Sequence, residues 1–296
     1  MNFVEVIIQN CFSLIRLVLG VNKRNSSKQL LLSFKNKSNA LILGNGPSLT
    51  QSLELYQNEF NQFDLIAVNR FPETDAYTEL KPSILVLLAP QFFKPDSELS
   101  QEYILANQSL FEHLAKKTAW PLLIVAPANE RGSKQLADLL KRNKYIKVYY
   151  IKTSPMEGLV FFKHLMFSLR QGMPRPHNVL IPSLMIAIQA KYEQIAIVGA
   201  DHSWLKEISV AKKNEALVHQ KHFYDENSSS PKQMADYIVR PRKLHEILHK
   251  FYLAFKGYWE ISNYAKEKGV RIVNCSETSM IDAFERGTIN SITKRN

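Results

Sequence analysis

Cysteine is scarce in this sequence, and its two copies lie far apart. Cys11 falls in an apolar N-terminal segment and Cys275 follows a predicted buried strand. Small secreted domains rely on several paired cysteines, so two isolated ones indicate a reducing compartment rather than a disulfide framework. No Cys and His residues stand at the spacing of a zinc site, and the sequence therefore predicts no bound metal.

The sequence also has no hydrophobic run long enough to span a membrane. A spanning helix needs about 20 apolar residues, whereas the N-terminal apolar stretch is shorter and carries Glu5 and Arg16. Its basic residues follow the apolar stretch, which is the reverse of their order in a signal peptide. Repeats are absent, and the polar run 227–230 is too short to link two domains. The length of 296 residues fits one large core, or one domain with a lid.

Acidic residues are too few to balance the basic ones. The formal net charge is +11, and nearly half of the excess lies in the first 38 residues, where Glu5 is the only acid. The basic residues of this segment are Arg16, Lys23, Arg24, Lys28, Lys35 and Lys37. Such a segment is typical of contact with a polyanion. Because aromatic residues do not alternate with the basic ones, we expect no nucleic acid as a partner.

An amphipathic helix is predicted just before this basic run. In residues 2–20, polar or small residues recur every three or four positions, at Asn2, Glu5, Gln9, Ser13, Arg16 and Gly20. That spacing puts a narrow polar stripe on a wide apolar helix, which suits a membrane interface. We expect residues 2–37 to contact an anionic membrane surface. The alternative is packing on the protein's own core or on a partner subunit, because amphipathicity does not separate the two.

From residue 40 the pattern changes to short apolar runs bounded by Pro, Gly, Asn or Asp. Seven runs predict strands buried on both faces, at 40–44, 64–69, 83–90, 121–127, 147–151, 194–201 and 270–275. Helical patterns lie between them, at 97–117, 133–143, 157–170, 183–191 and 241–268. The alternation predicts an α/β fold, Rossmann-like and doubly wound, with a mostly parallel sheet.

Two boundaries follow from these patterns. Residues 1–38 form the expected membrane-associating segment, and residues 39–296 form the expected catalytic domain. The stretch at about 202–240 interrupts the alternation, is polar and has no clear core face. A long insertion after a strand end is often an active-site lid, and we expect one here.

The first predicted strand ends in a loop that contains two glycines. The loop reads Gly44, Asn45, Gly46, Pro47 and Ser48, and it leads into a predicted helix. Glycine lets a ligand approach the backbone, and free N–H groups at a helix start attract anions. The loop therefore predicts a phosphate or nucleotide contact, although it matches neither the dinucleotide nor the P-loop pattern. A plain strand-to-helix turn is the alternative.

Asn69 ends the second predicted strand and is expected beside this loop. Its amide suits a base or a ribose. The alternative is an asparagine that only terminates the strand.

Acidic and histidine residues follow the sixth predicted strand. Asp201 and His202 are expected at the same sheet edge as the glycine loop, and His219 and His222 come later in the lid. Histidine is the usual general base near neutral pH, and a carboxylate orients it. We expect His222 to be the base, because the aromatic pair 223–224 beside it can anchor a lid. Asp201 and His202 are further catalytic candidates. A solvated loop position is the alternative for each histidine, and a metal held by Asp201, His202 and His222 is another.

Three stretches resemble the bacterial sialyltransferases of glycosyltransferase family 42 and related proteins of unknown function that share a GxGPSL loop. They are GNGPSL at 44–49, VNRF at 68–71 and KYEQIAIVGAD at 191–201. RIVNCSETSMIDAF at 271–284 is similar to the C-terminal strand and helix of that family, whereas PHNVLIPS at 176–183 departs from its pattern. The resemblance implies a CMP-activated sugar held by the loop and Asn69, a lid histidine as base, and no required metal or cofactor.

Together these observations predict a glycosyltransferase that uses a nucleotide-activated sugar donor, CMP-linked by resemblance. A sialic-acid-like or other keto-acid sugar is the expected group, and a hydroxyl of a bacterial surface glycan or glycolipid, in lipopolysaccharide or capsule, is the expected acceptor. The expected location is peripheral, at the cytoplasmic face of the inner membrane, and a homo-oligomer is left open. The alternatives are an ATP-dependent pterin-type diphosphokinase of the related loop family and a non-catalytic nucleotide-binding membrane protein.

Overall fold

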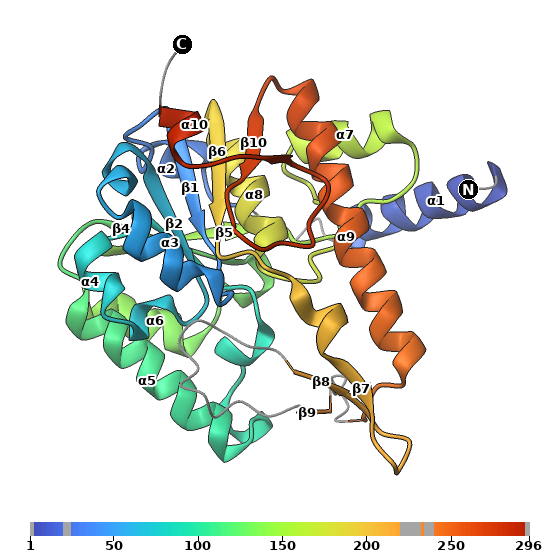
Figure 1. Ribbon diagram of the computed structural model, residues 1–296, viewed down its shortest axis with the longest axis horizontal. Helices are drawn as coiled ribbons and strands as arrows, with labels where there is room; N and C mark the ends of the chain where they lie inside the picture. The colour runs from blue at the N-terminus through green and yellow to red at the C-terminus, as the bar shows by residue number, and fades with distance from the viewer. Residues whose placement is uncertain (1–2, 20–24, 220–231, 234–239, 294–296) are drawn as a thin grey trace.

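Helices cover both faces of a central eight-stranded sheet, and a small three-stranded sheet lies at one end of the molecule (Figure 1). The computed structural model describes residues 3–19, 25–219, 232–233 and 240–293. The strand order in the large sheet is β11-β10-β6-β1-β2-β3-β4-β5, and every neighbouring pair is parallel. The predicted Rossmann-like α/β fold is therefore confirmed.

All the strands predicted from apolar runs are present. Their bounds are β1 Asn39–Leu43, β2 Asp64–Val68, β3 Ile84–Val86, β4 Leu122–Pro127, β5 Ile146–Ile151, β6 Gln194–Val198 and β10 Arg271–Asn274. The short strand β11, Glu285–Arg286, extends the sheet beyond β10 and has no counterpart among the predictions. Its two exposed charged residues form no apolar run from which a strand can be recognised.

Each face of the sheet has its own hydrophobic layer. One face is covered by α3 Ser48–Tyr56, α4 Ala76–Leu80, α5 Gln101–Lys117, α6 Lys134–Arg142 and α10 Asn290–Thr293. The other face is covered by α2 Lys28–Leu32, α7 Val160–Ser168, α8 Leu180–Gln189 and α9 Leu244–Glu267. Short 3-10 helices lie in the connections, η1 Glu59–Gln62, η2 Phe71–Glu73, η3 Pro90–Phe92, η4 Asp96–Glu98, η5 Ala128–Glu130 and η6 Ser203–Glu207.

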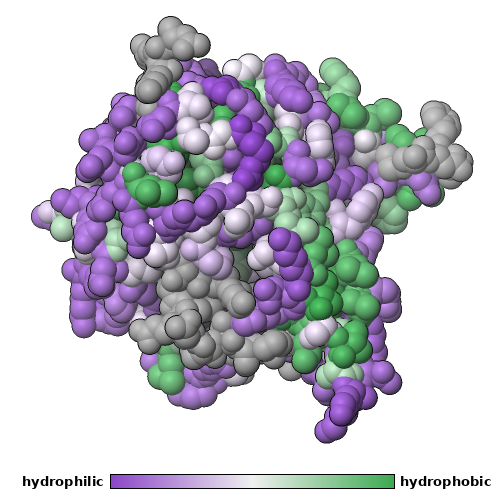
Figure 2. Space-filling model, viewed as in Figure 1, coloured by the Kyte–Doolittle hydropathy of each residue, from purple (hydrophilic) through white to green (hydrophobic). Residues whose placement is uncertain are grey.

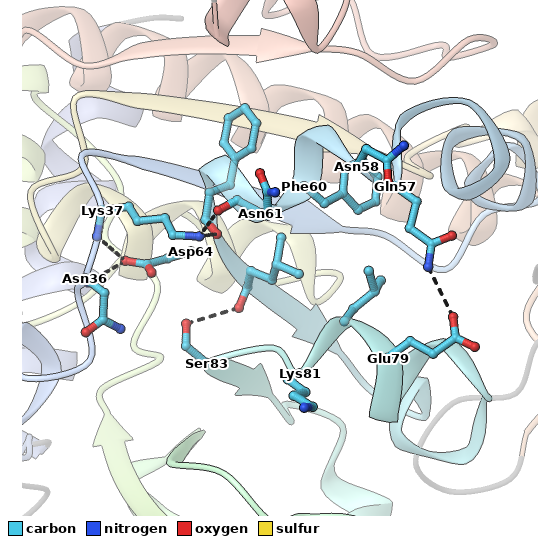
Figure 3. Close-up of a pocket in the computed structure, with 13 residues that line it drawn as sticks. Asn36, Lys37, Gln57, Asn58, Phe60, Asn61, Asp64, Glu79, Lys81 and Ser83 are labelled. Carbon is cyan, nitrogen blue, oxygen red and sulfur yellow. Dashed lines mark hydrogen bonds between the residues drawn. The ribbon is translucent and has the colours of Figure 1, made fainter.

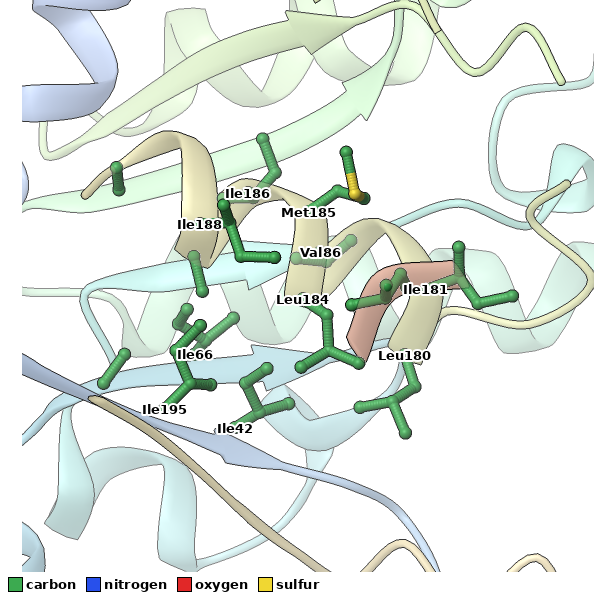
Figure 4. Packing of buried hydrophobic residues seen from close by; sticks show 14 of the residues in the cluster. Ile42, Ile66, Val86, Leu180, Ile181, Leu184, Met185, Ile186, Ile188 and Ile195 are labelled. Atoms are coloured by element: carbon green, nitrogen blue, oxygen red, sulfur yellow. The ribbon is translucent and has the colours of Figure 1, made fainter. Parts of the chain in front are cut away.

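The helix α8 lies closest to the centre of the molecule. Its residues from Leu180 to Ile188 are all buried. Figure 4 shows Leu184 reaching toward Ile42 of β1 and Ile66 of β2. A helix that is apolar on all sides is typical of a position between two other layers, here the sheet and α9.

The stretch after β6 carries more structure than its polar sequence indicates. The strands β7 Ile208–Val210, β8 Ala216–Val218 and β9 Lys232–Gln233 form the small antiparallel sheet. Ala216 and Val218 are buried against Ile247 and Phe251 of α9. The expectation that this stretch has no core face is therefore wrong. Strands of two or three residues are too short for an alternating pattern to reveal them.

The chain after β10 is irregular. Residues 275–284 form no helix, although the resemblance implied one there. Ser276, Thr278 and Ser279 instead hydrogen-bond to Ala200 and Asp201, just after β6. In addition, Asn274 Oδ1 accepts the N–H of Ser276 and Ser279 Oγ accepts that of Ile281. Such local bonds from short polar side chains compete with helix formation, which explains the difference.

The predicted N-terminal helix is present as α1, Phe3–Leu19, and it projects from the molecule near α7 (Figure 1). Within the described part of the chain, no helix combines the length and the apolar character that crossing a membrane requires.

Candidate functional site

The candidate site lies where the order of strand addition reverses. β1 has β2 on one side and β6 on the other, and the chain adds β2 to β5 before it returns to place β6. In open α/β sheets such a reversal leaves a crevice at the carboxyl ends of the strands, where ligands bind. The loop after β1, Asn69 after β2 and Asp201 after β6 lie at this one edge, as the sequence predicts.

The loop Gly44–Ser48 packs directly against the chain that follows β6. Gly44 N donates to Val198 O at 2.8 Å, and Gly46 N donates to Gly199 O at 2.8 Å. A side chain at Gly44 would overlap the Gly199 carbonyl, and one at Gly46 would overlap the Asp201 carboxylate. The two glycines thus permit contact between two loops, whereas the sequence interpretation assigned them to the approach of a ligand. A bulky substitution there would disturb the fold, so it would not report on ligand binding alone.

Asp201 links three segments at this edge. Its carboxylate is buried, and Oδ2 accepts the backbone N–H of Ser48 at 3.2 Å while Oδ1 accepts the hydroxyl of Thr278 at 2.9 Å. Ser48 is the first residue of α3, so the carboxylate occupies a helix N-terminus, where the helix dipole favours negative charge. The geometry explains Asp201 as a structural link, and its catalytic role stays a prediction.

Three polar atoms beside the loop are buried and have no hydrogen-bond partner among the residues that the structure describes: Asn45 Oδ1, Ser48 Oγ and Asn69 Oδ1. Asn45 Nδ2 donates to Val68 O at 3.3 Å, which brings the Asn45 amide next to Asn69. An unpaired buried polar group costs about 1–3 kcal/mol, so such groups are rare. Three of them at one sheet edge indicate a place that accommodates a polar ligand. Pro47 contributes only an exposed backbone position between Asn45 and Ser48.

His202 lies beside Asp201 but contacts α9. Its Nε2 shares a hydrogen bond with the hydroxyl of Tyr258, and its ring centroid is 4.1 Å from that of Trp204. Burial lowers the pKa of His202 to about 3, because the imidazolium form is poorly solvated there. A base with that pKa binds a proton weakly at neutral pH. The geometry therefore favours a packing role for His202, and its role in catalysis stays a prediction.

The two lid histidines fall on either side of the limit of the described residues. His222 lies outside them, so its role as base stays a prediction. His219 follows β8, where its Nδ1 is 3.5 Å from Glu207 Oε2 and its backbone N–H donates to Glu207 O at 3.1 Å. This pair joins β8 to the start of β7. Among the residues that the structure describes, no group of three His, Cys, Asp or Glu is placed to hold a metal ion.

Basic side chains surround His177, which the sequence analysis did not single out. Burial first, and then the charges of Arg175, Lys250, His249 and Arg242, lower the pKa of His177 to about 4. Its Nε2 is buried, and none of the described residues forms a hydrogen bond with it. His177 precedes α8, whose amino end lies at the carboxyl edge of the sheet because α8 leads to the start of β6. The signal in the sequence is a His-Asn pair directly before an apolar helix.

A cavity of about 460 Å³ opens at the opposite edge of the sheet, at the amino ends of β1, β2 and β3 (Figure 3). Asp64 in its wall accepts the backbone N–H groups of Asn36 at 2.7 Å and Lys37 at 3.0 Å, and the hydroxyl of Tyr192 at 2.9 Å. These bonds pair the carboxylate within the protein. The cavity holds none of the predicted site residues and lies at the edge where ligands of such sheets do not bind.

The similarity of this chain to known proteins is slight. No protein-family model and no curated protein matches the sequence. Among solved structures, the MAf glycosyltransferase from Magnetospirillum magneticum AMB-1 is similar, with 12% sequence identity and a TM-score of 0.47. The similarity covers 90% of this chain and 38% of that chain. A likeness at this level carries no argument about activity, and the fold class stands on the sheet described above.

Proposed function

We propose that the protein is a glycosyltransferase that holds a nucleotide-activated sugar at the carboxyl edge of its sheet. The observation that supports this proposal most directly is the group of buried polar atoms on Asn45, Ser48 and Asn69 that have no partner among the described residues. They lie at the strand reversal where sheets of this kind bind nucleotides. An amide oxygen and a hydroxyl are suitable partners for the hydroxyl and amino groups of a nucleoside.

The donor phosphate is proposed to lie toward the basic cluster around His177 rather than on the helix start. Asp201 already occupies the amino end of α3, and a phosphate next to this carboxylate would be repelled. Arg242 and Lys250 instead supply positive charge at the same edge of the sheet, together with Arg175, which also pairs with Glu157 at 3.3 Å. Cations placed in this way stabilise the charge that develops on a leaving phosphate without the aid of a metal.

The remaining parts of the proposal come from the sequence. The resemblance of the loop and of VNRF supports a CMP-linked donor, and His222 is the proposed base that takes the proton of the acceptor hydroxyl. The amphipathic α1 supports a lipid-linked surface glycan as acceptor, reached from the cytoplasmic face of a membrane.

A diphosphokinase is the second candidate. Such an enzyme would need Mg²⁺ held by carboxylates. Asp201 is the carboxylate at this edge that the sequence offers as a ligand, and both of its oxygens already accept hydrogen bonds within the protein. The same binding experiment separates the candidates, because they differ in the nucleotide that they prefer.

The experiment is a thermal-shift screen with CMP, UDP, GDP, ATP and their sugar conjugates, on the wild type, Ser48→Ala and Ser52→Ala. A ligand at 100 times its Kd adds about 2.7 kcal/mol of stability. Ser48→Ala removes an unpaired hydroxyl, so we expect the free protein to keep its stability while nucleotide affinity falls roughly five- to ten-fold. Ser52, one turn later in α3, is the matched control, since its hydroxyl is already bonded to Ser48 O.

A stabilising shift with CMP or its sugar conjugates, weakened in Ser48→Ala alone, supports the proposal. A preference for ATP favours the diphosphokinase. If every nucleotide raises the melting temperature of Ser48→Ala as much as that of the wild type, the loop is only a strand-to-helix turn. Transfer assays on His222→Ala then test catalysis, where loss of a general base lowers turnover by about 10²–10⁴. Nucleotide binding without any measurable transfer would leave the non-catalytic alternative.

A further inference from the structure

The helix α1 contacts the rest of the protein through its polar stripe. Ser13 is fully buried, and its hydroxyl donates to Glu157 O at 2.9 Å and accepts from Glu157 N at 2.8 Å. Arg16 Nη1 lies 2.9 Å from the Glu157 carboxylate, and Asn10 Oδ1 accepts the N–H of Leu159 at 3.2 Å. The stripe therefore faces the protein, and no element in the described part of the chain covers the apolar side of α1.

The outward side of α1 carries large apolar side chains. Ile7, Ile8, Phe12, Leu14 and Ile15 are each between 47% and 54% exposed. At 100° per residue, Ile7, Ile8 and Ile15 lie about 120–160° around the helix from Ser13, and Phe12 and Leu14 lie on its two flanks. Amphipathic helices of soluble proteins usually bury this side, so its exposure calls for a partner.

The helix α7 continues the same surface. It starts at the segment on which α1 packs, and Phe161 on its first turn is 81% exposed. Leu159, Val160, Leu165 and Leu169 are exposed as well. These five residues and the five of α1 are called the α1–α7 patch, and Figure 2 shows apolar residues at this corner of the molecule. Two helices with exposed apolar sides form a broader surface than α1 alone.

The surroundings of the patch are positively charged. Of the four Lys or Arg residues between 158 and 192, Lys163 and Arg175 pair with Glu260 and Glu157, whereas Arg170 directly follows Leu169 of the patch. Lys28 lies close to Arg170 and Lys191, whose charges, after burial, lower its pKa. A second copy of the chain docked on the patch would bring like charges together. Anionic lipid headgroups would neutralise them, so the charge pattern selects a lipid surface as the partner.

We propose that the α1–α7 patch docks the protein on an anionic lipid bilayer, with α1 and α7 lying together in the interfacial region. The sequence predicted such a contact for residues 2–37 alone, and α7 is the element that the structure adds. Apolar burial and attraction to anionic headgroups are the two terms that determine interfacial binding, and the patch supplies both. This inference is independent of the transferase activity.

Flotation of the full chain with lipid vesicles tests the proposal. The variants are Phe161→Ser and, as a matched control, Leu105→Ser on α5, whose side chain is also exposed but lies away from α1 and α7 (Figure 1). We expect the wild type to float with vesicles that contain phosphatidylglycerol and far less with pure phosphatidylcholine. Phe161→Ser should lower the partition coefficient roughly ten-fold, whereas Leu105→Ser should leave it unchanged.

Three results would overturn the proposal. Phe161→Ser could float like the wild type, Leu105→Ser could lose as much binding as Phe161→Ser, or binding could be the same on neutral and anionic vesicles. Analytical ultracentrifugation of the same proteins tests whether a second copy of the chain binds the patch instead. A wild-type dimer that Phe161→Ser converts to a monomer, with no flotation of either, would assign the patch to contact between copies. Far-UV circular dichroism confirms that Phe161→Ser is folded, as its exposure leads us to expect.

Discussion

Among single residues, Asp201 has the clearest structural role. It accepts hydrogen bonds from Ser48 N and from the hydroxyl of Thr278, so removal of its carboxylate leaves both donors without that acceptor. We expect Asp201→Ala to lower the free energy of unfolding by roughly 1.5–3 kcal/mol, and Thr278→Val by about 1 kcal/mol. Urea denaturation measures both. A stable Asp201→Asn variant with no transfer activity would instead point to a catalytic carboxylate.

His202 and His177 give the protein a dependence on pH. Burial holds their pKa values at about 3 and about 4 in the folded protein, below the ordinary value of 6.5. Between the folded pKa of each histidine and pH 6.5, the unfolded chain therefore binds more protons than the folded protein does. Stability present above pH 6.5 is then lost as the pH falls, at up to about 1.4 kcal/mol per pH unit for each histidine.

Denaturation at pH 7.5 and pH 5 measures this loss. His202→Asn should make the loss of stability smaller, because it removes one of the two imidazoles that titrate. Asparagine is chosen because it tolerates the positive φ of 51° at this position. His113→Asn serves as the control, since this histidine lies on α5 and its Nδ1 bonds to Ser109 O of the same helix. The same loss in His202→Asn as in the wild type would contradict the assignment.

The residues of the site were predictable only in part. The position of Asp201 follows from its place after an apolar run, but its partner Ser48 lies 153 residues earlier, and no local pattern reveals that contact. For the same reason the contact of the two glycines with the neighbouring loop was not foreseen, while their contact with a ligand stays a prediction. His177 was overlooked because a single histidine before a helix has no spacing partner in the sequence.

At the scale of elements, one buried hydroxyl, that of Ser13, contributes two of the hydrogen bonds that attach α1. Ser13→Ala would leave both backbone groups of Glu157 without this partner, at a cost of about 1–3 kcal/mol to the docking of the helix. We expect faster hydrogen exchange in residues 3–19 and unchanged exchange in the central strands. Cys11→Ala, on the exposed side of the helix, is the control. Equal exchange in Ser13→Ala and the wild type would show that the stripe does not hold α1.

The elements themselves were largely predictable because the sheet is buried on both faces. A strand such as β4, with every residue buried, must be an uninterrupted apolar run, and such a run is visible in the sequence. The strands β7, β8 and β11 are short and partly exposed, so they carry no such signal. The polar stripe of α1 predicted the helix correctly, yet it could not tell which side faces the protein.

At the scale of the whole molecule, α8 packs between the sheet and α9. A cavity in the middle of α8 should therefore lower the stability of the whole domain. Leu184→Ala deletes a fully buried side chain, and we expect a loss of about 2–5 kcal/mol. All probes of unfolding should shift together, in contrast to the local effect of Ser13→Ala. Leu140→Ala, at an exposed position on α6, should change stability by less than about 0.5 kcal/mol. Different midpoints by fluorescence and circular dichroism in Leu184→Ala would show separately unfolding parts.

The place of β1 between β2 and β6 has a consequence for folding during synthesis on the ribosome. The residue that pairs with Leu43 on the β6 side is Val198, about 155 residues further along the chain. At 5–20 residues per second, this partner strand is synthesised roughly 8–30 s after β1. During that time one edge of an apolar strand stays unpaired in the nascent chain, open to other chains. A holding chaperone, or slow release of the first half of the protein, would shield it until the second half arrives.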